Sequence, residues 1–193
     1  MVDAYTLKTE ALCWLRFSKQ LPYIATEVVF HRNEDVLGMN EEYSVEVEVK
    51  VSLQDLKREF KTKEGKHYLY NNAAPGLSVP NFFYFYLPQE LEEKAVEIVA
   101  AEAPKAGVAI YDGARGRDGK RTRIARRATR LHEGKPSRTV IKTLIARMGS
   151  ELCLRHVLQR KIREEIIQKF DMLNDQIVNS AKEIPNTTDW EKE

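Results

Sequence analysis

The sequence is poor in cysteine and has no long hydrophobic run. Cys13 and Cys153 are its two cysteines, and their wide separation fits neither a disulfide framework nor a zinc site. No apolar stretch approaches the roughly 20 residues needed to cross a bilayer. Residues 1–12 include Asp3 and Glu10 and lack an apolar block, which argues against a secretory signal. We therefore expect a protein of the reducing cytoplasm.

The chain also has little net charge, +2, but that charge is unevenly distributed. Residues 115–147 hold twelve Lys and Arg against Asp118 and Glu133, which leaves 19 basic and 27 acidic residues elsewhere, a net of −8. A cationic segment on an otherwise acidic chain indicates a polyanionic partner. The hydrophobic content of 42% over 193 residues predicts one packed domain with an appendage.

Hydrophobic periodicity predicts an α/β fold. The pattern predicts a helix over 3–20, strands over 23–31, 35–39 and 43–51, a helix over 53–70 with a break near 65, a strand over 81–87, a helix over 88–103 and a strand over 107–111. Residues 32–34 and 40–42 are expected to form turns. This order favours a mixed sheet with helices on its faces, which would make residues 1–112 a compact core.

The rest of the chain has a different character. Residues 113–136 are rich in Gly and Arg, and 120–132 fit a basic strand or hairpin. Residues 137–182 predict one long amphipathic helix, and we expect residues 183–193 to be a disordered tail. The apolar residues of the long helix do not form a clean heptad. They fit packing against the core as well as self-association, which would make the protein a homodimer.

The strand over 43–51 carries the most informative pattern. Its valines alternate strictly with Glu46, Glu48 and Lys50, so these three side chains share one face. Such alternation is also typical of a plain solvated face. Asp35, on the preceding short strand, can lie next to Glu48 in a hairpin, and two close carboxylates repel each other unless a cation joins them. Oxygen ligands of this kind suit Mg²⁺ or Mn²⁺, and a nearby lysine can stabilise charge developing on a phosphate.

These residues resemble a known superfamily, the PD-(D/E)xK nucleases, which share the restriction-endonuclease-like αβββαβ core. Within it, the segments DVLGMNEEYSVEVEVKVSLQDLKREF, KHYLY, NFFYFYLP and GVAIYDG are most similar to the MmcB-like bacterial DNA-repair group. The resemblance covers about residues 5–130, although Asn33-Glu34-Asp35 lacks the proline of the signature.

The resemblance implies roles for individual residues. Asp35, Glu48 and Lys50 would be catalytic, and Asp35 and Glu48 would hold Mg²⁺ or Mn²⁺ with the Val49 carbonyl. A further metal ligand from the first helix is expected at Glu10, with Glu27 as its rival. Side chains expected around this centre, which also fit a solvated surface, are Glu46, Lys66, His67 and Tyr70.

The basic segment is expected to bind DNA phosphates without reading sequence. Its candidate residues are Arg115, Arg117, Lys120, Arg121, Arg123, Arg126, Arg127 and Arg130. The predicted function is therefore a magnesium-dependent DNA endonuclease of repair, recombination or phage DNA processing. Two alternatives are a catalytically silent DNA-binding module of the same fold and a dimeric assembly protein that binds an acidic partner.

Overall fold

The computed structural model describes residues 2–28, 34–73, 79–113 and 121–182, with side chains described up to residue 177. The chain forms two compact units, Met1–Gly149 and Ser150–Glu193. The first unit is an α/β domain, as predicted. The expected turn at 32 and 33 and the expected tail 183–193 lie outside the described residues. No helix in the described ranges is both long and apolar enough to cross a membrane.

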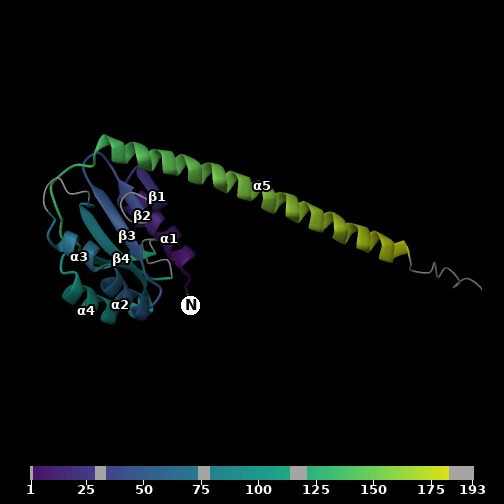
Figure 1. Cartoon of the computed structure of the whole chain (residues 1–193). Coiled ribbons are helices and arrows are strands. Elements are labelled where there is room, and N and C mark those ends of the chain that lie inside the picture. The colour runs from purple at the N-terminus through teal and green to yellow at the C-terminus, as the bar shows by residue number, and fades with distance from the viewer. Residues whose placement is uncertain (1, 29–33, 74–78, 114–120, 183–193) are drawn as a thin grey trace, which may run out of the picture. The chain divides into compact units, whose positions relative to one another are not determined.

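Within the described residues, six strands form one mixed sheet in sequence order (Figure 1). The strands are β1 (Tyr23–Val28), β2 (Glu34–Met39), β3 (Ser44–Val49), β4 (Phe82–Pro88), β5 (Gly107–Tyr111) and β6 (Thr122–Arg126). β1, β2 and β3 are antiparallel neighbours, β3, β4 and β5 run parallel, and β6 returns antiparallel to β5. β3, the strand with alternating valines, is therefore central.

The predicted helices are present with sharper boundaries. They are α1 (Ala4–Cys13), the π-helix η1 (Trp14–Ser18), α2 (Leu53–Thr62), α3 (Glu64–Asn71), the 3-10 helix η2 (Gln89–Leu91), α4 (Glu92–Glu102) and α5 (Arg138–Lys182). The predicted break near residue 65 is confirmed, because Lys63 leaves helical geometry between α2 and α3. Ser52 caps α2 by accepting a hydrogen bond from the Asp55 N–H (3.1 Å).

One local expectation was wrong. Glu34, expected in a turn, begins β2. Phe17, within the predicted first helix, is 75% exposed. The cause is the change from α1 to the wider η1, which alters the register of side chains after Cys13. Trp14 and Leu15 remain buried against the sheet.

The two faces of β3 meet different layers (Figure 1). Val45, Val47 and Val49 pack in one core with Leu7 and other residues of α1 and η1. The opposite face of the sheet is covered by α2, α3 and α4, whose core includes Leu56, Phe85 and Val99. Because side chains alternate along a strand, Glu46 and Glu48 project into this second layer.

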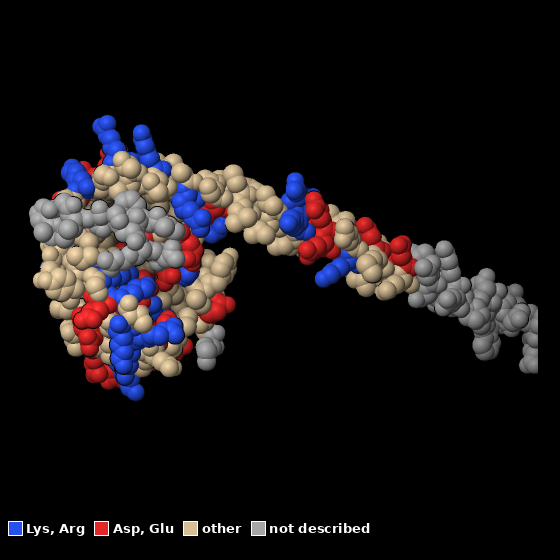
Figure 2. All heavy atoms as spheres, in the orientation of Figure 1, with Lys and Arg blue, Asp and Glu red and all other residues tan. Residues whose placement is uncertain are grey.

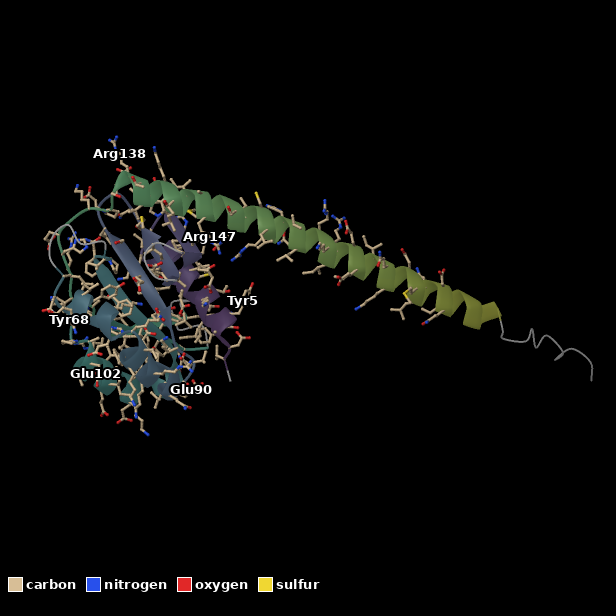
Figure 3. The ribbon with its side chains drawn as sticks, viewed as in Figure 1. Tyr5, Tyr68, Glu90, Glu102, Arg138 and Arg147 are labelled. Carbon is tan, nitrogen blue, oxygen red and sulfur yellow. The ribbon has the colours of Figure 1, made fainter. Side chains whose placement is uncertain are left out.

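The segment after the predicted core also belongs to the first unit. β6 pairs with β5, where Gly107 is required because a Cβ there would lie 2.3 Å from Cε1 of Tyr84. The beginning of α5 packs on the sheet as well, where Leu144 is buried with Leu37 and Met39. Arg147 of α5 (Figure 3) donates a hydrogen bond from its Nε to the carbonyl of Thr26 (3.1 Å).

Candidate functional site

A buried network of acids and lysines surrounds Glu48. Glu48 is 2% exposed, and its Oε1 lies 3.0 Å from Nζ of Lys50 and 2.8 Å from Nζ of Lys63. Its Oε2 lies 2.8 Å from Nζ of Lys66. Glu48 and Lys50, predicted to share one face of the strand, are in contact, and two further ammonium groups share the same carboxylate.

The network continues along β3 and into α2 and α3. Lys66 Nζ lies 2.7 Å from Oε1 of Glu46, whose Oε2 accepts a hydrogen bond from the Tyr70 hydroxyl at 2.6 Å. Glu59 Oε2 lies 3.0 Å from Nζ of Lys50, and Glu59 Oε1 lies 3.5 Å from Nε2 of His67. Glu46, Lys66 and Tyr70, expected near the centre, are thus in it, and the alternative of a solvated face is wrong for these buried side chains.

Glu59 and Lys63 were missed by the sequence reasoning. Their signal is spacing, because Glu59, Lys63, Lys66 and Tyr70 follow one another at intervals of four, three and four residues. On each side of the break at Lys63, that spacing places Glu59 with Lys63, and Lys66 with Tyr70, on a common side of a helical turn. To place Glu59 and Lys63 beside Glu48, one would also need to predict which face α2 and α3 turn toward β3.

The network stays charged despite its burial. Burial raises the pKa of Glu48, but Lys66 and Lys50 outweigh it, and Glu48 ends below its ordinary value of 4.5. Glu59 behaves alike: burial raises its pKa, yet His67, Lys66 and Lys50 hold it well below 4.5. Burial lowers the pKa of Lys66, but Glu46 and Glu48 raise it above 10.5. Three lysines thus neutralise three carboxylates.

These shifts predict how stability depends on pH. The folded-state pKa values of Glu48 and Glu59 lie below 4.5, so their contribution to the stability of the fold is complete above pH 4.5. This contribution is lost as the pH falls through the folded-state pKa values. The pKa of Lys66 is raised in the folded state, so its contribution to stability is complete below pH 10.5. This contribution is lost as the pH rises through the folded-state pKa. We expect the free energy of unfolding to be flat between those limits and to fall below pH 4.5. Urea titrations followed by Trp14 fluorescence, with Trp190→Phe, measure it; a steady decline between pH 7 and 5 would contradict it.

Asp35 lies on β2, the strand that pairs with β3. The pairing of Val36 with Val47 brings Asp35 level with Glu48, as the hairpin predicted. Its Oδ2 accepts a hydrogen bond from the Val49 N–H (2.9 Å), between Glu48 and Lys50 in the chain. Its Oδ1 lies 2.9 Å from Nζ of Lys8 on α1.

Glu27, and not Glu10, is the acidic neighbour of Asp35. Lys8 Nζ contacts the carboxylates of both Glu27 and Asp35. Glu27 has a φ of 48°, a left-handed conformation that costs energy for a residue with a side chain. Glu10, the preferred candidate, is instead paired with Nη1 of Arg121 at 2.8 Å. It is separated from Glu48 because α1 packs on the valine face of β3.

The predicted ligands do not form a ready metal centre. Among the described residues, no three His, Cys, Asp or Glu side chains are placed to hold a metal ion together. The donor chemistry still fits a hard divalent cation, since the carboxylate oxygens of Glu46, Glu48 and Glu59 are the ligand type that Mg²⁺ prefers. The cation-binding charge is present, but lysine ammonium groups neutralise it.

Most described arginines of the basic segment have contacts within the protein. Arg121 pairs with Glu10, Arg123 with Glu92, and Arg126 donates to the carbonyls of Pro104 and Ala106. Arg130 lies 3.1 Å from Glu133 and remains exposed, as does Arg127. Arg115, Arg117 and Lys120 lie outside the described residues.

Comparison with known proteins supports the fold. No known family model matches the sequence, and no curated protein matches it. A solved structure, the SPO1766 protein of unknown function from Silicibacter pomeroyi, is similar with a TM-score of 0.53 and 19% identity. The match covers 83% of this chain and 92% of that one. It shows a shared α/β fold.

Proposed function

We propose that this protein is a metal-dependent DNA endonuclease with a restriction-endonuclease-like core. The observation that carries the proposal is the contact of Asp35 with the Val49 N–H at 2.9 Å, beside Glu48 and Lys50. It places two carboxylates and a lysine on adjacent central strands, the minimal set for hydrolysis of a phosphodiester. The order α1, β1, β2, β3, α2 and α3, β4 supports the proposal, since it follows the expected αβββαβ core.

Each residue has a defined part in this function. Asp35 and Glu48 would hold Mg²⁺ or Mn²⁺, which supplies an activated water and screens the phosphate when bound. Lys50 positions a water or stabilises charge on the phosphoryl oxygens. Lys66 and Tyr70 hold Glu46, and through Lys66 also Glu48, in a fixed orientation.

Binding of a cation requires an ammonium group to leave. Lys63 is the most easily released lysine of the network, because its side chain is 37% exposed against 8% for Lys50 and 2% for Lys66. It can exchange Glu48 and Glu59 for water at the surface, whereas Lys66 cannot. We therefore assign Lys63 as the lysine whose ammonium group leaves Glu48 when a cation binds.

The surface near the site carries positive charge for a phosphate backbone. α2 begins three residues after Lys50, and Lys57, Arg58 and Lys61 line a hollow of about 500 Å³ along it. Figure 2 shows basic side chains gathered at the lower end of the first unit, beside acidic ones. Exposed Arg127 adds to the candidate contacts. Such contacts predict salt-sensitive binding without base readout.

A second candidate is a catalytically silent DNA-binding module of the same fold. One observation favours it: both oxygens of Glu48 are already occupied by Lys50, Lys63 and Lys66, and the carboxylate is buried. In that case the network is a structural element of the domain. DNA binding would then depend on the basic residues alone.

One experiment separates the two candidates. The full chain is incubated with plasmid, single-stranded, flap and four-way-junction DNA in Mg²⁺, Mn²⁺ or EDTA, and binding is measured at 50 and 200 mM salt. We expect products in the metal-containing reactions and none in EDTA. Salt-sensitive binding without products would select the silent module, and neither binding nor products would reject both.

A further inference from the structure

The helix of the second unit exposes a continuous apolar stripe. Its members are Leu158, Ile162, Ile166, Phe170, Leu173 and Ile177, which are 49–67% exposed. They advance by four, four, four, three and four residues, so they share one face of α5. An apolar helix face of this length is unfavourable in water and marks an interaction surface.

The charge of the same helix is divided into two halves. Residues 150–163 hold four basic side chains against one acidic, a net of +3. Residues 164–177 hold four acidic side chains against one basic, a net of −3. A second copy of this helix is therefore complementary in the antiparallel orientation, where each basic half meets an acidic half. A parallel pair would bring like charges together along its whole length.

We infer that two copies of this chain associate through the apolar stripe with their α5 helices antiparallel, crossing between Ile162 and Ile166. Leu158 and Phe170 lie four residues outside these two positions, so each faces the other across the crossing. The helix dipoles add to this preference, since antiparallel helices place opposite ends together. The inference goes beyond the nuclease proposal and does not depend on it.

The spacing of the stripe supports a single crossing region. Its steps average more than the 3.5 residues of a heptad, so the stripe does not follow a long left-handed supercoil. Pairs near the crossing, Ile162 with Ile166 and Leu158 with Phe170, then provide most of the contact. On the flanks, Lys161 of one copy approaches Glu165 of the other, twice by symmetry.

Orientation is tested by disulfide formation in the full chain with Cys13→Ser and Cys153→Ser. Antiparallel helices that cross between Ile162 and Ile166 bring Leu158 of one copy to Phe170 of the other, close enough for a disulfide. We expect a mixture of size-tagged L158C and untagged F170C chains to give a mixed crosslinked dimer on oxidation. Each variant alone should give little dimer. Efficient crosslinking of L158C with itself would overturn the inference in favour of parallel pairing.

Association itself is tested by sedimentation equilibrium on a matched pair of variants. Phe170 lies in the stripe near the crossing and is 67% exposed, while Met172 lies off the stripe and is 64% exposed. A monomeric helix would tolerate lysine equally at both positions. We expect Phe170→Lys to weaken dimerisation roughly tenfold or more and Met172→Lys to leave it nearly unchanged. A monomeric parent chain, or equal effects of the two variants, would overturn the inference.

Discussion

Lys66→Met is expected to destabilise the first unit by about 3–5 kcal/mol, because it removes one partner from a buried charge network. Lys66 is 2% exposed, and its ammonium lies within 2.8 Å of carboxylate oxygens of both Glu46 and Glu48. Methionine fills similar space, so the loss comes from uncompensated charge and not from a cavity. Urea unfolding followed by Trp14 fluorescence, with Trp190→Phe in both proteins, measures the difference.

Lys63→Met is the matched control for this prediction. Lys63 also contacts Glu48, at 2.8 Å, but its side chain is 37% exposed. Water can replace its ammonium, and Lys50 and Lys66 remain on the carboxylate, so we expect a loss of about 1 kcal/mol or less. Similar losses for the two variants would show that the network is not a buried, charge-compensated cluster.

A double variant isolates the charge of Glu46. Glu46→Gln combined with Lys66→Met should be more stable than Lys66→Met alone, because the carboxylate left without its ammonium is no longer charged. Glu48 keeps Lys50 and Lys63 in this background. A double variant that is less stable than Lys66→Met would indicate that packing, and not charge, determines the loss.

Local sequence pattern predicted the strand that carries the site. Strict alternation of Val45, Val47 and Val49 with Glu46 and Glu48 defines two faces, and the structure has both. The central place of β3 followed from strand order. Here the period of two residues is a direct consequence of backbone geometry, so no tertiary information was needed.

The partners of those carboxylates were harder to predict. Whether Glu48 meets water, a metal or a lysine depends on which face of α2 and α3 turns toward β3, and that is set by packing of Leu56 and Phe85 in the second core. Glu10 illustrates the same limit. Its helix was predicted correctly, but the side of the sheet on which α1 packs decides that it meets Arg121.

The same geometry changes the expected set of metal ligands. Two acids, Asp35 and Glu27, share Lys8, whereas Glu48 shares its lysines with Glu59. Lysines therefore neutralise both carboxylate pairs, Asp35 with Glu27 and Glu48 with Glu59. A cation that joins Asp35 and Glu48 must compete with Lys8 as well as Lys63. We therefore expect cleavage to require millimolar metal. Its rate should reach a maximum only at a higher metal concentration than in a site that has no competing ammonium group.

Asp35→Asn is expected to lower metal-dependent cleavage roughly 10³-fold while leaving the fold intact, since a metal ligand contributes several kcal/mol to phosphoryl chemistry. The asparagine carbonyl oxygen can still accept the hydrogen bond from the Val49 N–H, so β2 and β3 stay joined. What disappears is the negative charge beside Glu48. Initial rates on the preferred DNA at saturating Mg²⁺, with binding measured in EDTA, separate catalysis from affinity.

Glu27→Gln and Glu10→Gln complete the argument about the second acid. Glu27 shares Lys8 with Asp35, so its substitution should lower cleavage roughly 10- to 100-fold, as expected for a group that orients a metal ligand. Glu10 is paired with Arg121 instead of with Lys8, and its substitution should leave the rate within about twofold. A large loss in Glu10→Gln with normal rates in Asp35→Asn would move the active centre to the Glu10–Arg121 pair. Normal rates in all three variants would remove the metal site from this strand pair and leave the buried network with a structural role.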